Sequence, residues 1–189
     1  MDRRFVALAG ILAMAPLAAQ AEDISYSYVD VGYIAVNFDD FSEDADGFVL
    51  RGSIDIAERF FLFADYVEVS VSGIDEQDYG VGFGYAWPAS DTMSVYGKLG
   101  YVRAEADAFG FSLDDDGYSL AAGVRARVAE QFELEGSINY ADFGDLGDGT
   151  SLGIGARYYF TEQFAVGLEG GFGDDANSYG IGFRWQWGN

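Results

Sequence analysis

The chain has 189 residues, and its 32 acidic side chains outweigh 10 basic ones to give a formal net charge of −22. This balance excludes the basic face that nucleic-acid binding requires, so we expect no nucleic-acid partner. The absence of Cys excludes disulfides and a lipoprotein anchor, and the absence of His removes the commonest general base. With 26 Gly, 13 Tyr, 16 Phe and 2 Pro, the composition indicates an all-β fold.

The first residues have the layout of a signal peptide. Arg3 and Arg4 precede an apolar run over residues 5–17, and Ala19-Gln20-Ala21 forms a small-x-small cleavage site. A membrane anchor is the alternative, but the run is shorter than the roughly 20 residues that a helix needs to cross hydrocarbon. We therefore expect a signal peptide over residues 1–21 and one domain over residues 22–189.

The rest of the chain consists of stretches that alternate with period two, separated by turns, which indicates strands. The pattern predicts ten strands, at residues 26–37, 48–56, 60–71, 79–87, 93–106, 117–128, 132–140, 151–160, 164–172 and 179–187. Ten is an even number, as closed antiparallel transmembrane barrels of bacteria require. An eight-stranded barrel is the alternative, if one weak hairpin folds over the surface.

Two kinds of connection join these strands. The short turns repeat one motif, in Ala57-Glu58-Arg59-Phe60, Ala129-Glu130-Gln131-Phe132 and Thr161-Glu162-Gln163-Phe164, with a longer turn at residues 88–92. The others are acidic segments, at residues 38–47, 73–78, 107–116, 141–150 and 173–178. Short periplasmic turns and longer external loops are typical of an outer-membrane barrel.

The last predicted strand carries the strongest signal. Its odd-numbered residues from Tyr179 to Trp187 are all aromatic or aliphatic, whereas the even-numbered ones are Gly, Arg or Gln. This pattern suits a wall with lipid outside and a polar interior. A C-terminal strand that ends in aromatics also resembles the signal that the barrel-assembly machinery recognises for insertion, and Gly182, Trp185 and Trp187 fit that signal.

The same alternation predicts an apolar outward face with an aromatic girdle at each end. The girdle residues are Trp87, Tyr158, Phe160, Trp185 and Trp187 near the short turns, and Tyr79, Tyr118, Tyr140 and Tyr179 near the acidic segments. A soluble lipocalin-like barrel would place apolar residues inside and charges outside. The basic residues here fall on the inner face, which disfavours that alternative.

Centring each short turn on its Glu fixes the pairing of the strands. The resulting register places Arg125 opposite Glu135, Arg127 opposite Glu133 and Arg51 opposite Asp65, with Arg157 diagonally across from Glu169. We therefore predict a lumen ion-pair network of Arg51, Asp65, Arg125, Glu135, Arg127, Glu133, Arg157, Glu169 and Arg184.

This network has two interpretations. One is a charged constriction that selects small ions. The favoured one is a structural network that plugs the lumen, because the cross-strand partners neutralise most charges. Glycines on the inner face leave space either for large inward neighbours or for a narrow water path.

The acidic segments also have two interpretations. Because Ca²⁺ takes six to eight oxygen ligands, Asp44, Asp46, Asp114, Asp115 and Asp116 are candidates for weak divalent-cation loops that link to lipopolysaccharide phosphates. Both stretches begin like an EF-hand loop but lack the bidentate Glu at the twelfth place. We favour solvated loops that keep the chain soluble, alongside periplasmic chaperones, during its transit.

We expect no enzymatic activity and no cofactor. Outer-membrane proteases, phospholipases and lipid A-modifying barrels generally rely on His, which this chain lacks. Chemistry by carboxylates alone would need a recessed acid pair with separated pKa values. The inward acids here mostly face Arg.

In its patterning, the chain resembles the small outer-membrane barrels of the OmpA and OmpX type. Its segment Ile24-Ser25-Tyr26-Ser27-Tyr28-Val29-Asp30-Val31-Gly32-Tyr33-Ile34, and the Asp-rich stretch into Gly47-Phe48, are similar to the mature start of a xanthomonad family of small outer-membrane barrels. That family was once proposed as a secreted immunity activator and signal. The resemblance implies residence in the outer membrane of a Gram-negative bacterium, shedding in outer-membrane vesicles and surface recognition.

The favoured function is that of a structural and surface-interaction barrel in the lipid bilayer, in contact with lipopolysaccharide. Its acidic loops would meet cations or cationic surface partners. The alternative is a narrow passive channel for small solutes that prefers cations.

Overall fold

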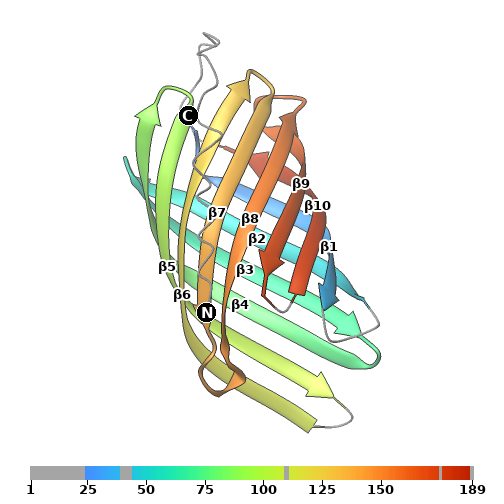
Figure 1. Cartoon of the computed structure of the whole chain (residues 1–189). Helices are drawn as coiled ribbons and strands as arrows, with labels where there is room; N and C mark the ends of the chain where they lie inside the picture. Colours follow the sequence, from blue (N-terminus) through green and yellow to red (C-terminus); the bar gives the residue numbers. More distant parts are fainter. Residues whose placement is uncertain (1–23, 39–43, 109–110, 175, 188–189) are drawn as a thin grey trace, which may run out of the picture.

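The computed structural model describes residues 24–38, 44–108, 111–174 and 176–187, so the predicted signal peptide lies outside the described residues. Ten strands form one closed barrel in which every neighbouring pair is antiparallel, and β1 pairs with β10 (Figure 1). The strands are β1 (Tyr28–Phe38), β2 (Ala45–Ala57), β3 (Phe60–Val71), β4 (Ile74–Ser90), β5 (Met93–Ala108), β6 (Phe111–Ala129), β7 (Phe132–Asp142), β8 (Asp148–Tyr159), β9 (Phe164–Gly173) and β10 (Ala176–Gln186). The ten-stranded prediction is confirmed, and the eight-stranded alternative is wrong.

The register predicted from the short turns is also present. Arg127 pairs with Glu133 and Arg125 with Glu135 between β6 and β7, and Arg51 pairs with Asp65 between β2 and β3. The register shifts by one residue next to the turns after β2, β4 and β6. These bulges let a tight turn join strongly twisted strands. Pro88 lies at the second of these bulges, in β4, which is a position where a strand tolerates proline's missing N–H donor.

Three of the predicted acidic loops are largely strand, including residues 173–178, where β9 ends at Gly173 and β10 begins at Ala176. β4 begins at Ile74 and β6 at Phe111, so most of the segments 73–78 and 107–116 belong to paired strands. A tight turn at Ser72 and Gly73, with φ of 51° and 84°, joins β3 to β4 directly. The hairpin of β5 and β6 consequently reaches beyond its neighbours (Figure 1). Loops were predicted there because charged residues disfavour a buried strand. The prediction was wrong because these strand ends extend beyond the membrane layer, where their charges stay in water.

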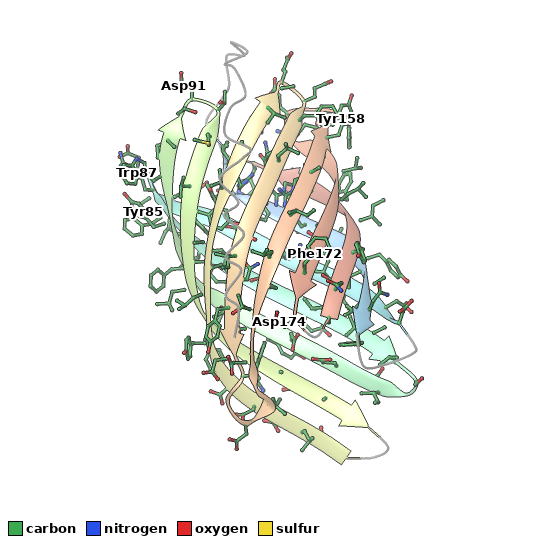
Figure 2. All side chains as sticks on the ribbon, in the orientation of Figure 1. Tyr85, Trp87, Asp91, Tyr158, Phe172 and Asp174 are labelled. Carbon is green, nitrogen blue, oxygen red and sulfur yellow. The ribbon has the colours of Figure 1, made fainter. Side chains whose placement is uncertain are left out.

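The outward face is apolar, as the alternation predicts. Leu50, Ile154 and Ile181 are each about half exposed, in contrast to Arg125 at 2% on the inner face. Tyr85 and Trp87 point away from the barrel, and Tyr158 lies at the end of the barrel opposite Asp174 (Figure 2). Among the described residues, no helix is both long and apolar enough to cross a membrane. The short 3₁₀ segment η1 (Gly144–Leu146) connects β7 to β8.

Candidate functional site

Glu133, the second residue of β7, lies inside the barrel near the short-turn end and has no exposed surface. Arg125 donates to both of its carboxylate oxygens, from Nε at 3.0 Å and from Nη2 at 3.1 Å. Arg157 donates to Oε1 at 3.2 Å, and the guanidinium groups of Arg127 and Arg184 lie 3.7 Å from the same carboxylate. These five residues form the Glu133 cluster, in which one buried carboxylate offsets part of the charge of four guanidinium groups.

Two further carboxylates, Glu135 and Asp30, offset more of the positive charge of this cluster. Glu135 accepts from Arg157 at 2.7 Å and from the hydroxyl of Tyr96 at 2.6 Å. Asp30 and Arg184 face each other where β1 meets β10, and they form a bidentate pair at 2.7 and 2.6 Å. Such two-pronged pairs fix the orientation of the guanidinium plane as well as its charge.

The ion pairs differ from the pairs that face each other in the ladder. Arg51 lies opposite Asp65, but its ion pair is with Glu169 at 2.7 Å, on β9, with β1 and β10 between the two strands. Arg125 likewise lies opposite Glu135 and binds Glu133. The ladder fixes the Cα positions, whereas a long guanidinium side chain reaches diagonal and more distant carboxylates. Among the described residues the predicted member Asp65 forms no salt bridge, whereas Asp30, which the predicted network left out, pairs with Arg184. The sequence therefore predicts most members of the network but not its connectivity.

Aromatic rings stack on the guanidinium groups of the network. The ring centroid of Tyr28 lies 3.7 Å from Cζ of Arg184, and that of Tyr159 lies 4.5 Å from Cζ of Arg127. The face of an aromatic ring attracts a cation, so these rings replace water around charges that have left it. The periodic pattern did not single them out, because Tyr28 and Tyr159 look like ordinary strand aromatics in the sequence.

The segment Ile24–Ser27, before β1, was predicted in part as strand and instead enters the lumen at the short-turn end. Tyr26 is 5% exposed, stacks on Phe61 with ring centroids 4.5 Å apart, and shares a 3.0 Å hydrogen bond with the hydroxyl of Ser94. Its backbone N–H donates to Asp55 at 3.1 Å. Arg125 donates to the carbonyl of Ser25 at 2.9 Å, which ties this segment to the Glu133 cluster.

The predicted insertion signal lies beside the same segment. Gly182 and Trp185 belong to β10, and Trp187 follows its end. The backbone N–H of Trp187 donates to the carbonyl of Ser27 at 2.9 Å, and Ser25 Oγ donates to the carbonyl of Trp187 at 3.0 Å. These two hydrogen bonds hold the segment Ile24–Ser27 against Trp187, the last aromatic residue of the barrel.

The inner glycines make room for large neighbours. A Cβ on Gly84 would overlap the ring of Phe61, and one on Gly180 would lie 2.8 Å from Cγ of Glu169. On Gly123 it would lie 2.5 Å from the hydroxyl of Tyr96. At these positions the glycines therefore make space for large inward side chains and not for a water path.

At the other end of the lumen, near the acidic segments, the wall formed by β1, β2 and β3 carries a cluster of aliphatic side chains, and Glu76 and Asp78 of β4 lie opposite Val69 and Val67. Ile34, Ala45 and Val69 are buried there, with Val36 and Val67 packed against them. Gly47 lies between Ile34 and Val69 in one row of the ladder, so the strands on either side approach over it. The alternating pattern predicts a polar interior throughout, so this aliphatic cluster was not predicted.

Protein groups already engage some of the candidate cation ligands at the rim. Arg103 donates to Asp114 at 2.8 Å. The two oxygens of Asp115 accept from the backbone N–H groups of Asp145 at 2.6 Å and Asp116 at 2.8 Å, and these bonds lower the pKa of Asp115. Asp44 precedes β2, and Asp46 lies within it. No group of three or more His, Cys, Asp or Glu in the described part of the chain has a geometry that would hold a metal ion.

The family model that matches the chain is the outer membrane protein beta-barrel domain, over residues 5–160. The chain belongs to this family. A ten-stranded barrel with an apolar outer face and family membership together place it in the outer membrane of a Gram-negative bacterium.

Several solved barrels are similar to the chain at low identity. The KdgM porin is 13% identical with a TM-score of 0.47, covering 84% of this chain and 99% of the porin. The attachment invasion locus protein Ail of Yersinia pestis is 18% identical with a TM-score of 0.41, over 84% and 97%. Neisserial surface protein A is 16% identical with a TM-score of 0.42, over 85% and 95%. A search of curated protein sequences finds no match.

Proposed function

We propose that this outer-membrane barrel is a structural and surface-interaction protein with a closed lumen. The observation that carries the proposal is the complete burial of Glu133 among four guanidinium groups, next to a mouth occupied by Tyr26. An open pore would expose such groups to water and screen them. The channel alternative would require these contacts to separate, which leaves charges uncompensated at a cost of several kcal/mol.

The outward ends of the barrel are the proposed interaction surface. Asp116, Asp145 and Asp148 are exposed there, and the whole chain has a net charge of −22. Such a surface attracts cations and cationic partners and repels anionic ones over about 10 Å at moderate ionic strength. The same charge is proposed to keep the chain soluble with periplasmic chaperones before insertion.

Catalysis and cofactor binding are not part of the proposal. The chain has no His, and Glu133 and Glu135 have guanidinium partners. Membership of the xanthomonad family, and with it release in vesicles and immune recognition, stays a prediction that rests on the segment after residue 23.

Single-channel recording in planar bilayers tests the closed lumen. The refolded barrel, verified by its heat-shifted gel band, is expected to show no discrete conductance steps. Residues 22–27 can then be deleted, and Glu133→Gln can be added, to open the lumen from the periplasmic side. Discrete steps from the unaltered barrel would contradict the proposal and favour the channel.

Binding of polylysine to the folded barrel tests the acidic surface. The triple variant Asp116→Asn, Asp145→Asn, Asp148→Asn is expected to bind more weakly and with less dependence on salt. A matched control places the same loss of charge at the other end, in Glu58→Gln, Glu130→Gln, Glu162→Gln. Equal weakening by both triple variants would show that only net charge matters and would reject the extracellular surface as the specific site.

A further inference from the structure

A shallow groove crosses the lipid-facing wall from β4 to β8. It has a volume of about 540 Å³, and its outward lining comprises Phe83, Tyr85, Leu99, Leu120, Ile138 and Tyr140. This volume falls in the range of small-ligand sites, roughly 300–1,000 Å³. The lining is apolar, and Phe83 and Ile138 are each 51% exposed on this face.

Missing side chains create the groove. Tyr85, Gly97, Ala122 and Ile138 follow one another in a single row of the ladder across β4, β5, β6 and β7. A Cβ on Gly97 would have only one neighbour within 4 Å, the carbonyl oxygen of Ala121 at 3.9 Å. The floor is therefore bare between two walls of large side chains. On the inner face, in contrast, the ring of Phe61 is packed on Gly84 and the side chain of Glu169 on Gly180.

The groove opens at the extracellular side of the membrane layer. Tyr140, which pairs with Leu120 and with Thr150, belongs to the aromatic girdle near the acidic segments, and Tyr85 lies deeper in the layer on the way to the short turn after β4. Because the strands tilt, a row of the ladder runs obliquely through the membrane. An occupant that enters at Tyr140 would thus descend toward Tyr85.

We infer that this groove holds one acyl chain of lipopolysaccharide, the lipid of the leaflet at which the groove opens. Within hydrocarbon, an occupant with unpaired polar groups is costly, whereas an acyl chain brings only apolar groups. It restores the dispersion contacts that the bare floor of Gly97 and Ala122 lacks. The hydroxyls of Tyr140 and Thr150 are at the level where the polar end of the lipid emerges.

The charges above the groove set a condition on binding. Asp116, Asp142 and Asp148 lie on the strands just beyond the girdle, next to Tyr118 and Tyr140. These carboxylates repel the phosphates of the lipid unless divalent cations lie between them. The inference uses only the position of the barrel in the outer membrane and is independent of the closed lumen.

Native mass spectrometry of the folded barrel with purified lipid A and Mg²⁺ tests the inference. The unaltered barrel is expected to retain one lipid A, and the double variant Gly97→Leu, Ala122→Leu, which fills the floor, is expected to lose it. Gly52→Leu is the matched control, because Gly52 also has open space at its Cβ position but lies on β2, outside the groove. This control is expected to retain the lipid, and heat-shifted gel bands verify that all three barrels fold.

Three results would overturn the inference. Equal retention of lipid A by all three barrels would mean that the groove is not its site. Retention of phosphatidylethanolamine in place of lipid A, with the same sensitivity to Gly97→Leu, would assign the groove to a different lipid. A dimer of the unaltered barrel that the double variant abolishes would assign it to a second copy of the chain.

Discussion

In the periplasmic half of the lumen, charged groups and aromatic rings are fully buried, whereas in the extracellular half one wall, on β1 to β3, is an aliphatic cluster. Glu133 and Phe61 represent the first half, and Ile34 and Val69 the second. The first half depends on compensated charge and the second on packing, so the two should respond differently to substitution and to salt. The difference shows that one closed barrel can be filled by two kinds of interaction at different depths.

The largest effect is expected from Glu133→Gln, which removes one charge with little change of shape. It leaves the buried guanidinium group of Arg125 without its bidentate partner and removes the second carboxylate partner of Arg157, at a cost of about 3–5 kcal/mol. Unfolding by guanidinium chloride in detergent micelles measures the loss. Glu169→Gln is the control, because Glu169 and its partner Arg51 are each 29% exposed and water replaces part of their interaction. Equal losses in the two variants would contradict the special position of Glu133.

Gly84→Ala is expected to destabilise the barrel by about 1–3 kcal/mol, because its Cβ overlaps the ring of Phe61. Adding Phe61→Leu should recover part of that loss. Gly52→Ala has nothing within 4 Å of its new Cβ and should change the stability by less than about 1 kcal/mol. The same unfolding experiment measures all of these variants, and a cost of Gly52→Ala as large as that of Gly84→Ala would refute the steric explanation.

Ile34→Val in the extracellular half should cost about 0.5–1.5 kcal/mol, since it removes one buried methylene from the aliphatic cluster. The loss should be the same at low and high salt, because no charge is involved. Unfolding curves in urea, which is uncharged, at a low and a high concentration of salt test this. A strong salt dependence for Ile34→Val would remove the distinction between the two halves.

The smallest effect concerns Asp115, outside the membrane layer. Backbone N–H groups of Asp145 and Asp116 hold the pKa of its carboxyl below the ordinary value. The ionised carboxylate therefore contributes stability above its unfolded pKa of about 3.9, and this contribution is lost as the pH falls through the lower folded pKa. The amide NMR signals of Asp145 and Asp116 should shift in that acidic range. Asp115→Asn should lack this transition, and its persistence in that variant would assign it to another carboxyl.

Much of the barrel could be predicted from the sequence because strands repeat every two residues and the turns set the register. The pairing of Arg127 with Glu133 followed from the position of Glu130 in its turn. The ion pair of Arg51 with Glu169 did not, because contacts across the lumen depend on side-chain reach and barrel curvature. Tyr26 was missed for a related reason: an alternating sequence at the start of a strand gives no sign that the chain turns into the lumen.

The most direct test of the closed lumen is the access of a charged thiol reagent to single cysteines, since the chain has no Cys of its own. Ser53 is 5% exposed and its hydroxyl has no hydrogen-bond partner among the described residues, so Ser53→Cys is a conservative probe of the periplasmic half. Ser178, half-buried in the extracellular half with its hydroxyl near Gly171, provides the comparison. We predict that Ser178→Cys reacts rapidly in the folded barrel and that Ser53→Cys does not. Equally rapid labelling of Ser53→Cys from the periplasmic side would contradict the closed lumen.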